Sequence, residues 1–171
     1  GQGSSLVNID GIVSPGSISV NGNADYTFSG GSVQGAGTLI KNGSGELSLR
    51  TDMTNWTGAI ELIDGTLNVG SDLAAVENGG GITVAGLSAL GMGGNIARTT
   101  LLNSDLTISV EEGDSFSHTG VISGEGDLTK TGDGVLTLGN NGNTFSGDLT
   151  VREGSLKLDR NSTSSSGVLG A

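Results

Sequence analysis

Apolar residues recur at a spacing of two along much of this chain, and a polar residue stands between the members of each pair. Ser48, for example, separates Leu47 from Leu49. Successive side chains of a β-strand point to opposite faces, so each pair shares one face and the polar residue lies on the other. We therefore expect short strands with one buried and one wet face. The pairs are Leu47/Leu49, Ile60/Leu62, Leu67/Val69, Leu136/Leu138, Leu149/Val151 and Leu156/Leu158.

Glycine-rich turns separate these predicted strands, for example at 42–45 and 132–134. Glycine supplies the positive φ angles that tight turns need. Segments 18–20 and 26–28 also alternate and are expected to be strands. No stretch shows sustained helical periodicity, so the pattern predicts an all-β fold.

Residues 35–69 are repeated, without a gap, as residues 124–158, which lie 89 residues further along the chain. Of the 35 aligned positions 11 are identical, and all of these are Gly, Leu or Lys. A repeat that retains glycines and alternating leucines while the other positions vary preserves backbone geometry and not chemistry.

A shorter period lies inside each copy. Leu47 is followed 20 residues later by Leu67, and Leu39 is followed 21 residues later by Ile60. If each unit is one coil of a solenoid, these side chains stack in continuous apolar columns. We therefore expect a right-handed parallel β-helix with 20–21 residues per coil and roughly 7–8 coils. Antiparallel hairpins or two facing sheets are the alternatives, and neither would stack these leucines.

The inward residues of the two copies are the predicted structural core. They are Leu39, Leu47, Leu49, Ile60, Leu62, Leu67, Val69, Leu128, Leu136, Leu138, Leu149, Val151, Leu156 and Leu158.

The chain is expected to be a single β-solenoid segment over residues 1–171. The least regular stretch is 71–104, where we expect coils interrupted by a longer loop or a short helix, with strands at 82–84 and 106–110. The chain begins at Gly1 and stops at Ala171 without an evident end cap, so we expect it to be an excised piece of a longer protein.

Composition narrows the functional classes. The formal net charge is −11, from 18 acidic and 7 basic residues, which argues against binding of nucleic acid or of an anionic membrane. No apolar run reaches 18 residues, so no membrane insertion of this segment is expected. Cysteine is absent, and with it disulfides and thiolate metal sites. Aromatic residues make up only 3%, which favours a thin core of Leu, Ile and Val.

Candidate chemistry is sparse. Asp114, Ser115 and the single histidine, His118, lie close in sequence, but one strand cannot point all three at one spot, so we expect a solvated polar face. The segment 124–128 has the texture of a calcium-binding repeat, yet Asp127 aligns with Thr38 in the other copy, so no metal site is expected. The Gly-rich loops lack a following Lys-Ser/Thr pair, which argues against phosphate binding. We therefore predict no catalytic residue, no cofactor and no metal.

Two further pairs of equivalent residues stand out. Lys41 and Lys130 are expected to point outward, where a charged side chain hinders edge pairing. Trp56 and Phe145 are also equivalent. Trp56 is either an exposed aromatic that binds a partner or a corner residue that fills the column beside a tight turn.

The pattern G-x-G-x-L-x-K-x-G-x-G-x-L-x-L, followed by an aromatic residue, Ser/Thr-Gly, alternating Leu/Val and Gly-x-Leu, is similar to the autotransporter-associated β-strand repeat. Residues 35–69 and 124–158 carry the resemblance. That repeat belongs to passenger domains of Gram-negative type V secretion. The resemblance implies a place on the bacterial cell surface, attached or released, with upstream coils and a C-terminal outer-membrane β-barrel of the same polypeptide as partners. It also suggests the autochaperone region that precedes the barrel, as in actin-recruiting proteins of the IcsA type.

Two functional hypotheses follow from the sequence and the resemblance. The first is a non-catalytic autochaperone and stalk that promotes folding, secretion and display of the passenger. The second is an adhesion or host-protein-binding module, such as one that recruits an actin-assembly factor through the outward face. An enzyme on a β-solenoid is a third hypothesis, which screening for glycan or ester cleavage would test.

Overall fold

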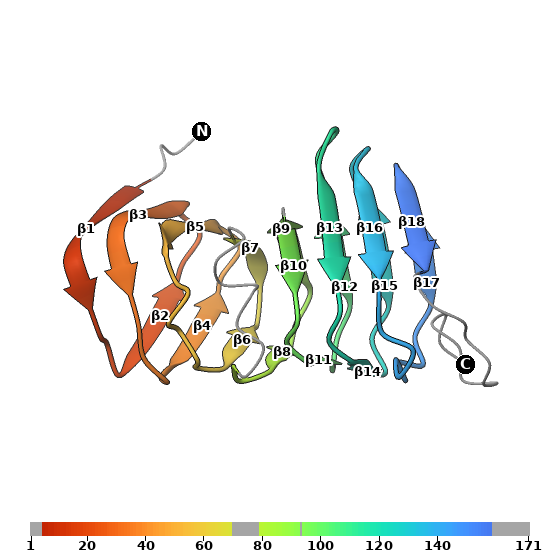
Figure 1. The fold of residues 1–171 in the computed structure, drawn as a ribbon, viewed down its shortest axis with the longest axis horizontal. Helices are drawn as coiled ribbons and strands as arrows, with labels where there is room; N and C mark the ends of the chain where they lie inside the picture. The colour runs from red at the N-terminus through yellow and green to blue at the C-terminus, as the bar shows by residue number, and fades with distance from the viewer. Residues whose placement is uncertain (1–4, 70–78, 93, 159–171) are drawn as a thin grey trace.

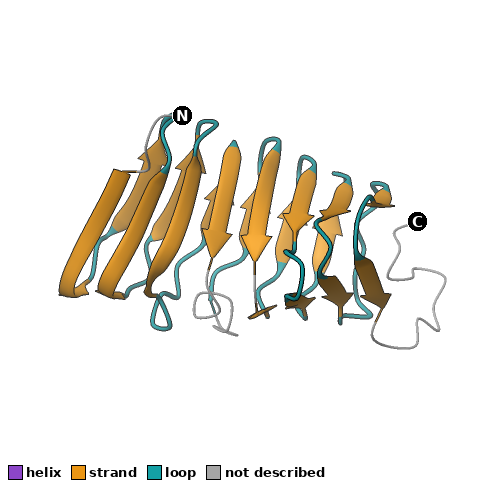
Figure 2. Ribbon diagram, turned by 90° about the horizontal axis from the view of Figure 1, so that it is seen from above, coloured by secondary structure: helices purple, strands orange, loops and turns teal. Residues whose placement is uncertain are grey.

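The computed structural model describes residues 5–69, 79–92 and 94–158, which form a rod of stacked coils (Figure 1). Strands, turns and loops build the described part, as Figure 2 shows. All pairings between its named strands are parallel. The parallel β-solenoid expected from the sequence is therefore confirmed, and hairpins are excluded as its organisation.

Three sheets run along the rod. The eight-stranded sheet has the order β1-β3-β5-β7-β9-β12-β15-β17. Its strands are β1 (Ser5–Val13), β3 (Tyr26–Val33), β5 (Glu46–Asp52), β7 (Gly65–Val69), β9 (Ser88–Met92), β12 (Leu106–Ser109), β15 (Leu128–Thr131) and β17 (Leu149–Val151).

The other two sheets form further sides of the rod, the four-stranded one only from β10 (Gly94–Ile96) onward. The six-stranded sheet consists of β2 (Ser17–Asn21), β4 (Thr38–Asn42), β6 (Ile60–Leu62), β8 (Ile82–Val84), β11 (Thr100–Leu102) and β14 (Ile122–Gly124). The four-stranded sheet consists of β10 (Gly94–Ile96), β13 (Ser115–His118), β16 (Val135–Leu138) and β18 (Ser155–Leu158).

Leucines one period apart are register partners in neighbouring coils, so their side chains stack. Leu47 is the register partner of Leu67, and Leu67 is that of Leu90. On the six-stranded sheet Leu39 pairs with Ile60. The stacking of like on like that the 20-residue period predicts is therefore present.

The core is a thin apolar column. Ten of the fourteen residues that the sequence assigns to it are buried: Leu39, Leu47, Leu49, Ile60, Leu62, Leu67, Val69, Leu128, Leu136 and Leu138. Leu149 and Leu156 are half-buried, whereas Val151 and Leu158 are 44% and 42% exposed. All four lie in β17 and β18, the last described strands of their sheets, so no further described strand covers them.

The described part of segment 71–104 is regular. It contributes strands β8 to β11 to all three sheets, including the strand expected at 82–84. The strand expected at 106–110 is β12. Of the longer loop or short helix expected in this segment, the described residues 79–92 and 94–104 show no helix, and residues 71–78 and 93 lie outside the described part.

The two repeat copies occupy different sides of the rod. Leu39 belongs to β4 in the six-stranded sheet, whereas its equivalent Leu128 belongs to β15 in the eight-stranded sheet. Four register steps on the six-stranded sheet lead from Leu39 to Ile122, and Leu128 lies in the next strand after it. The 89-residue period therefore spans four complete coils plus one further step from one sheet to the next around the rod.

The identical glycines have two physical roles. Gly43 and its equivalent Gly132 both have positive φ, at 84° and 74°. A Cβ on Gly58 would lie 1.5 Å from the carbonyl oxygen of Gly37 in the preceding coil, and its equivalent Gly147 meets the same kind of contact. The repeat therefore encodes one local corner structure, wherever on the rod that corner falls.

Candidate functional site

The described interior contains charged groups that the sequence analysis placed outside. Lys41 shares the inward face of β4 with Leu39 and is 1% exposed. Its Nζ donates hydrogen bonds to the carbonyl oxygens of Gly43, at 2.6 Å, and of Asp64 in the next coil, at 3.1 Å. The expected outward orientation is therefore wrong, because the side chain follows the alternation of its strand in spite of its charge.

Lys130 repeats this arrangement in the second copy. It is fully buried, and its Nζ donates to the carbonyl oxygens of Thr131 at 2.6 Å, Gly132 at 2.5 Å and Glu153 at 3.4 Å. Gly132 and Glu153 are the repeat equivalents of the Lys41 partners. The same contacts thus recur at a different corner of the rod.

The number of acceptors indicates that Lys130 is protonated. Three carbonyl oxygens around Lys130 match the three donors of an ammonium group, whereas a neutral amine offers only two. Burial lowers the pKa of both lysines, since desolvation disfavours the charged form. Nearby carboxylates act in the opposite direction: Asp64 raises the pKa of Lys41, and Glu153 raises that of Lys130.

Arg98 is a third buried cation, between β10 and β11, and is 1% exposed. Its Nη1 donates to the carbonyl oxygens of Gly58, at 2.6 Å, and Gly80, at 2.9 Å, and its Nη2 donates to that of Trp56. The guanidinium therefore ties together the corners of preceding coils. Buried carbonyl oxygens need donors, and long cationic side chains supply them where the chain turns.

His118 is also buried, at 2% exposure, on the inward face of β13 with Phe116. Its Nδ1 lies 3.1 Å from the carbonyl oxygen of Gly120, which can only accept, so Nδ1 carries the proton. Nε2 then accepts from the hydroxyl of Thr100, at 2.9 Å. Desolvation lowers the pKa of His118 to about 4, so the ring is neutral at pH 7.

The solvated face expected around His118 is therefore wrong for this residue. Asp114 and Ser115 are exposed while the imidazole is buried, so the three do not converge. Within the described residues no group of three His, Cys, Asp or Glu side chains is placed to hold a metal ion. The described part also contains no helix that is long and apolar enough to cross a membrane.

Trp56 and Phe145 are both fully buried. Trp56 forms a parallel bridge with Gly35, and its backbone N–H donates to the carbonyl oxygen of Met53 at 3.0 Å. Of the two alternatives, the corner aromatic is the one that the structure shows. The alternative prediction, that Trp56 is an exposed aromatic that binds a partner, is wrong because the side chain fills the interior beside the glycine corner.

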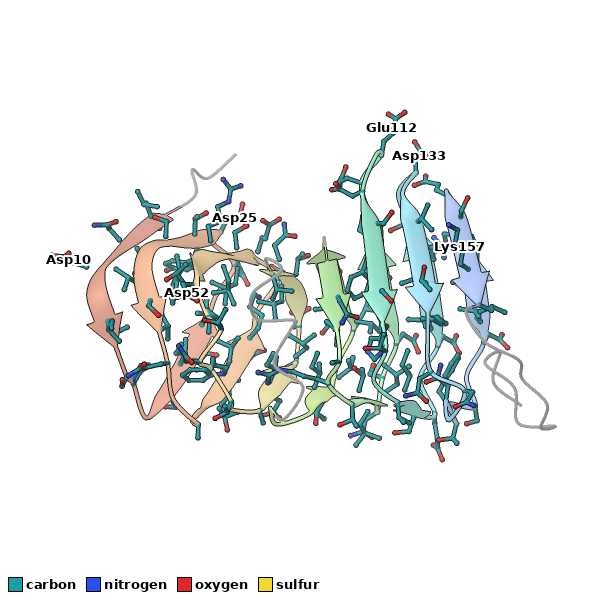
Figure 3. The ribbon with its side chains drawn as sticks, viewed as in Figure 1. Asp10, Asp25, Asp52, Glu112, Asp133 and Lys157 are labelled. Atoms are coloured by element: carbon teal, nitrogen blue, oxygen red, sulfur yellow. The ribbon has the colours of Figure 1, made fainter. Side chains whose placement is uncertain are left out.

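The outer face of the eight-stranded sheet carries a shallow groove of about 450 Å³. Its floor includes the small residues Ala89 and Gly91 of β9. Threonines, Ser109 and Asn68 of the neighbouring strands flank these two residues. Carboxylates of Glu46, Glu111 and Asp114 also line it. Figure 3 shows that Glu112 and Asp133 stand at the outer ends of neighbouring turns.

Both ends of the described rod expose apolar side chains. At the first coil Val7 and Val13 of β1, the register partners of Phe28 and Val33, are 36% and 38% exposed. A groove of about 240 Å³ opens there, lined by Val7, Ser19, Val20, Asn21, Tyr26 and Phe28. At the other end Val151 and Leu158 are exposed on β17 and β18. Strand edges with apolar residues attached are surfaces on which another strand can pair.

A parallel solenoid with a repeated glycine corner is the class that this geometry defines. The Passenger-associated-transport-repeat family model matches residues 39–69 and 128–158. "Adhesin BmaC autotransporter" of Brucella suis biovar 1 (strain 1330) is 33% identical over 127 residues, which is 74% of this chain but 4% of that protein. No solved structure matches the chain. The chain is a segment of an autotransporter passenger domain, a class located at the outer membrane and cell surface.

The narrower resemblance to actin-recruiting proteins of the IcsA type stays a prediction, since the comparisons do not test it.

The sequence analysis did not predict the burial of Lys41, Arg98, Lys130 and His118. For three of them a signal was present, because each stands two residues from an inward apolar residue: Lys41 from Leu39, Lys130 from Leu128 and His118 from Phe116.

Proposed function

We propose that this segment is a non-catalytic stalk and autochaperone that promotes folding and secretion of its passenger. The observation that supports the proposal is the pair of outer strand edges of the described rod, where inward-facing apolar residues are exposed: Val7 and Val13 at one end and Val151 at the other. Neighbouring coils of a longer polypeptide would cover these surfaces. The chain spans only 4% of the length of its adhesin relative, so a passenger of that kind has room for many such coils.

The physics of a solenoid favours this role. Each coil contacts only its neighbours, so the first coil to form has no template and bears the full cost of nucleation. A segment with matched leucine columns and short glycine turns lowers that cost. Once folded, the edge of β1 offers unpaired backbone groups to the coil that precedes it in the chain. The C-terminal outer-membrane β-barrel of the same polypeptide is the second partner in this proposal.

Surface display of the full-length protein tests the proposal. Leu47→Asp or Leu136→Asp places a charge in the fully buried column and should abolish display of the passenger. Leu101→Asp is the matched control, because Leu101 is 41% exposed on β11, and display should be retained. Protease accessibility on intact cells measures the outcome. Normal display of the two buried variants would remove the folding role.

A second candidate is adhesion through the groove on the eight-stranded sheet. The groove and its polar lining support it, and so does the relative, which is called an adhesin. Ala89→Arg or Thr107→Arg would fill the groove without entering the core, and Leu101→Arg on the six-stranded sheet is the control. Adhesion of displaying bacteria to host cells should fall for the groove variants alone. Equal adhesion of all three variants would exclude this face.

A further inference from the structure

The leucine columns alone do not determine how one coil aligns with the next. Inward residues alternate with a period of two, so a slip of two residues keeps every apolar side chain inside. Leu128, for example, lies on Leu149, but Val151 is also apolar and two residues away. Some other contact must therefore distinguish the native register from its slipped neighbours.

The lysine corners supply such a contact. The Nζ of Lys41 holds the carbonyl oxygen of Gly43 in its own turn and that of Asp64 in the next coil. Directly after Asp64, Gly65 lies over this group. A Cβ there would stand 2.3 Å from the Gly43 oxygen and 2.7 Å from the Lys41 Nζ, so only a glycine fits.

The second copy has the same three parts. Lys130 holds the carbonyl oxygens of Gly132 and Glu153, and Gly154 follows in the next coil. A Cβ on Gly154 would stand 2.4 Å from the Gly132 oxygen. Both glycines of the next coil have positive φ, at 80° for Gly65 and 69° for Gly154. All three positions of this set are identical in the two copies.

We propose that the two lysine corners are register locks. In each lock a buried ammonium group fixes a turn, so that the next coil fits only with its glycine over that turn. The locks consist of Lys41 with Gly43 and Gly65, and of Lys130 with Gly132 and Gly154. A slip of two residues moves a side chain into the space of the next coil's glycine and displaces that coil's carbonyl oxygen by about 6.6 Å along the strand, out of reach of the ammonium group. A buried polar contact that specifies register has the same physical basis in coiled coils. The inference concerns alignment of coils and is independent of the proposed role in secretion.

Disulfide trapping on the purified chain tests the lock, since the sequence contains no cysteine. Thr129 and Thr150 are register partners on the outward face of β15 and β17, so Thr129→Cys with Thr150→Cys reports the native register. Thr129→Cys with Asp148→Cys or with Arg152→Cys reports a slip of two residues. With Lys130 present, only the native pair should oxidise in a glutathione buffer. In Lys130→Met the slipped pairs should form at least tenfold more.

Leu136→Ala is the matched control. It removes packing from the fully buried column of the neighbouring strand and leaves the lysine contacts in place, so it should destabilise the chain without yielding slipped disulfides. Gly154→Ala breaks the lock from the other side while retaining Lys130, and it should yield them. The proposal is overturned if slipped pairs stay absent in either lock variant while it retains its β-sheet circular dichroism, or if they form equally in Leu136→Ala. Should Lys130→Met fail to fold, Gly154→Ala decides the question.

Discussion

Lys41 and Lys130 are equivalent residues of one repeat, yet they project into the rod from different sheets, β4 in the six-stranded and β15 in the eight-stranded sheet. Their contacts are nevertheless the same, a carbonyl oxygen two residues ahead and one 23 residues ahead. The local sequence therefore specifies a corner with its buried cation, and the position of that corner around the rod depends on the lengths of the coils between the copies.

The close contact at Gly58 predicts that an alanine there destabilises the chain far more than an alanine at a glycine with open space around it. Gly58→Ala should lower the free energy of unfolding by at least about 3 kcal/mol, because its Cβ would collide with the carbonyl oxygen of Gly37. Gly16→Ala is the matched control, since no atom lies within 4 Å of the added Cβ. It should change stability by less than about 1 kcal/mol. Urea unfolding followed by circular dichroism compares the two, and equal costs would contradict the close approach.

The single tryptophan gives a direct test of the corner. Trp56 is fully buried, so its fluorescence should be blue-shifted and protected from acrylamide until the chain unfolds. Trp56→Phe should cost only about 1 kcal/mol, because Phe145 fills the equivalent corner of the second copy. Trp56→Ala should cost about 4 kcal/mol. Red-shifted, quencher-accessible emission from the folded chain would restore the binding interpretation.

His118 should make the fold sensitive to mild acid. Burial lowers its pKa from 6.5 to about 4 in the folded chain. Between these values the unfolded chain binds a proton at this residue and the folded chain does not, so stability falls as the pH drops through this window. The loss is about 3 kcal/mol for this shift.

The C2–H resonance of this single histidine reports its pKa directly by NMR. His118→Gln removes the titrating group while the exposed carboxylates remain, so the difference between the two pH profiles isolates the histidine. Identical profiles between pH 4 and pH 6.5 would contradict the buried neutral imidazole.

Arg98 should be the most sensitive of the arginines in the described residues. Arg98→Leu leaves the carbonyl oxygens of Trp56, Gly58 and Gly80 without this donor, and we expect a loss of about 3 kcal/mol. Arg50→Leu is the control, since Arg50 is exposed on β5 and should change stability by less than about 0.5 kcal/mol. Chemical denaturation of both variants measures the difference, which should vanish if Arg98 is not buried in solution.

The period of the leucines was enough to predict the stacked coils, because each strand of a solenoid pairs with the strand one period away. Leu47 over Leu67 and Leu39 over Ile60 follow from spacing alone. The rotation between the copies could not be predicted in this way. It depends on coil lengths that vary, as between Ile82 and Thr100, which are partners only 18 residues apart.

The buried polar residues were predicted wrongly because polarity was given more weight than alternation. Lys41 and His118 each stand two residues from a buried apolar residue, and their strands keep the alternation. The cost of burying them is offset by carbonyl and hydroxyl partners that only the three-dimensional structure brings near. Periodicity reports which face a residue occupies, and tertiary contacts decide whether a charge is tolerated there.

Three of the seven lysines and arginines lie inside the rod, whereas no acidic residue is among the buried polar side chains of the described part. The exterior is therefore poorer in positive charge than the composition alone implies. Adjacent rods on a crowded bacterium should therefore repel one another within about 10 Å at ordinary salt, which opposes sideways association of the displayed segments.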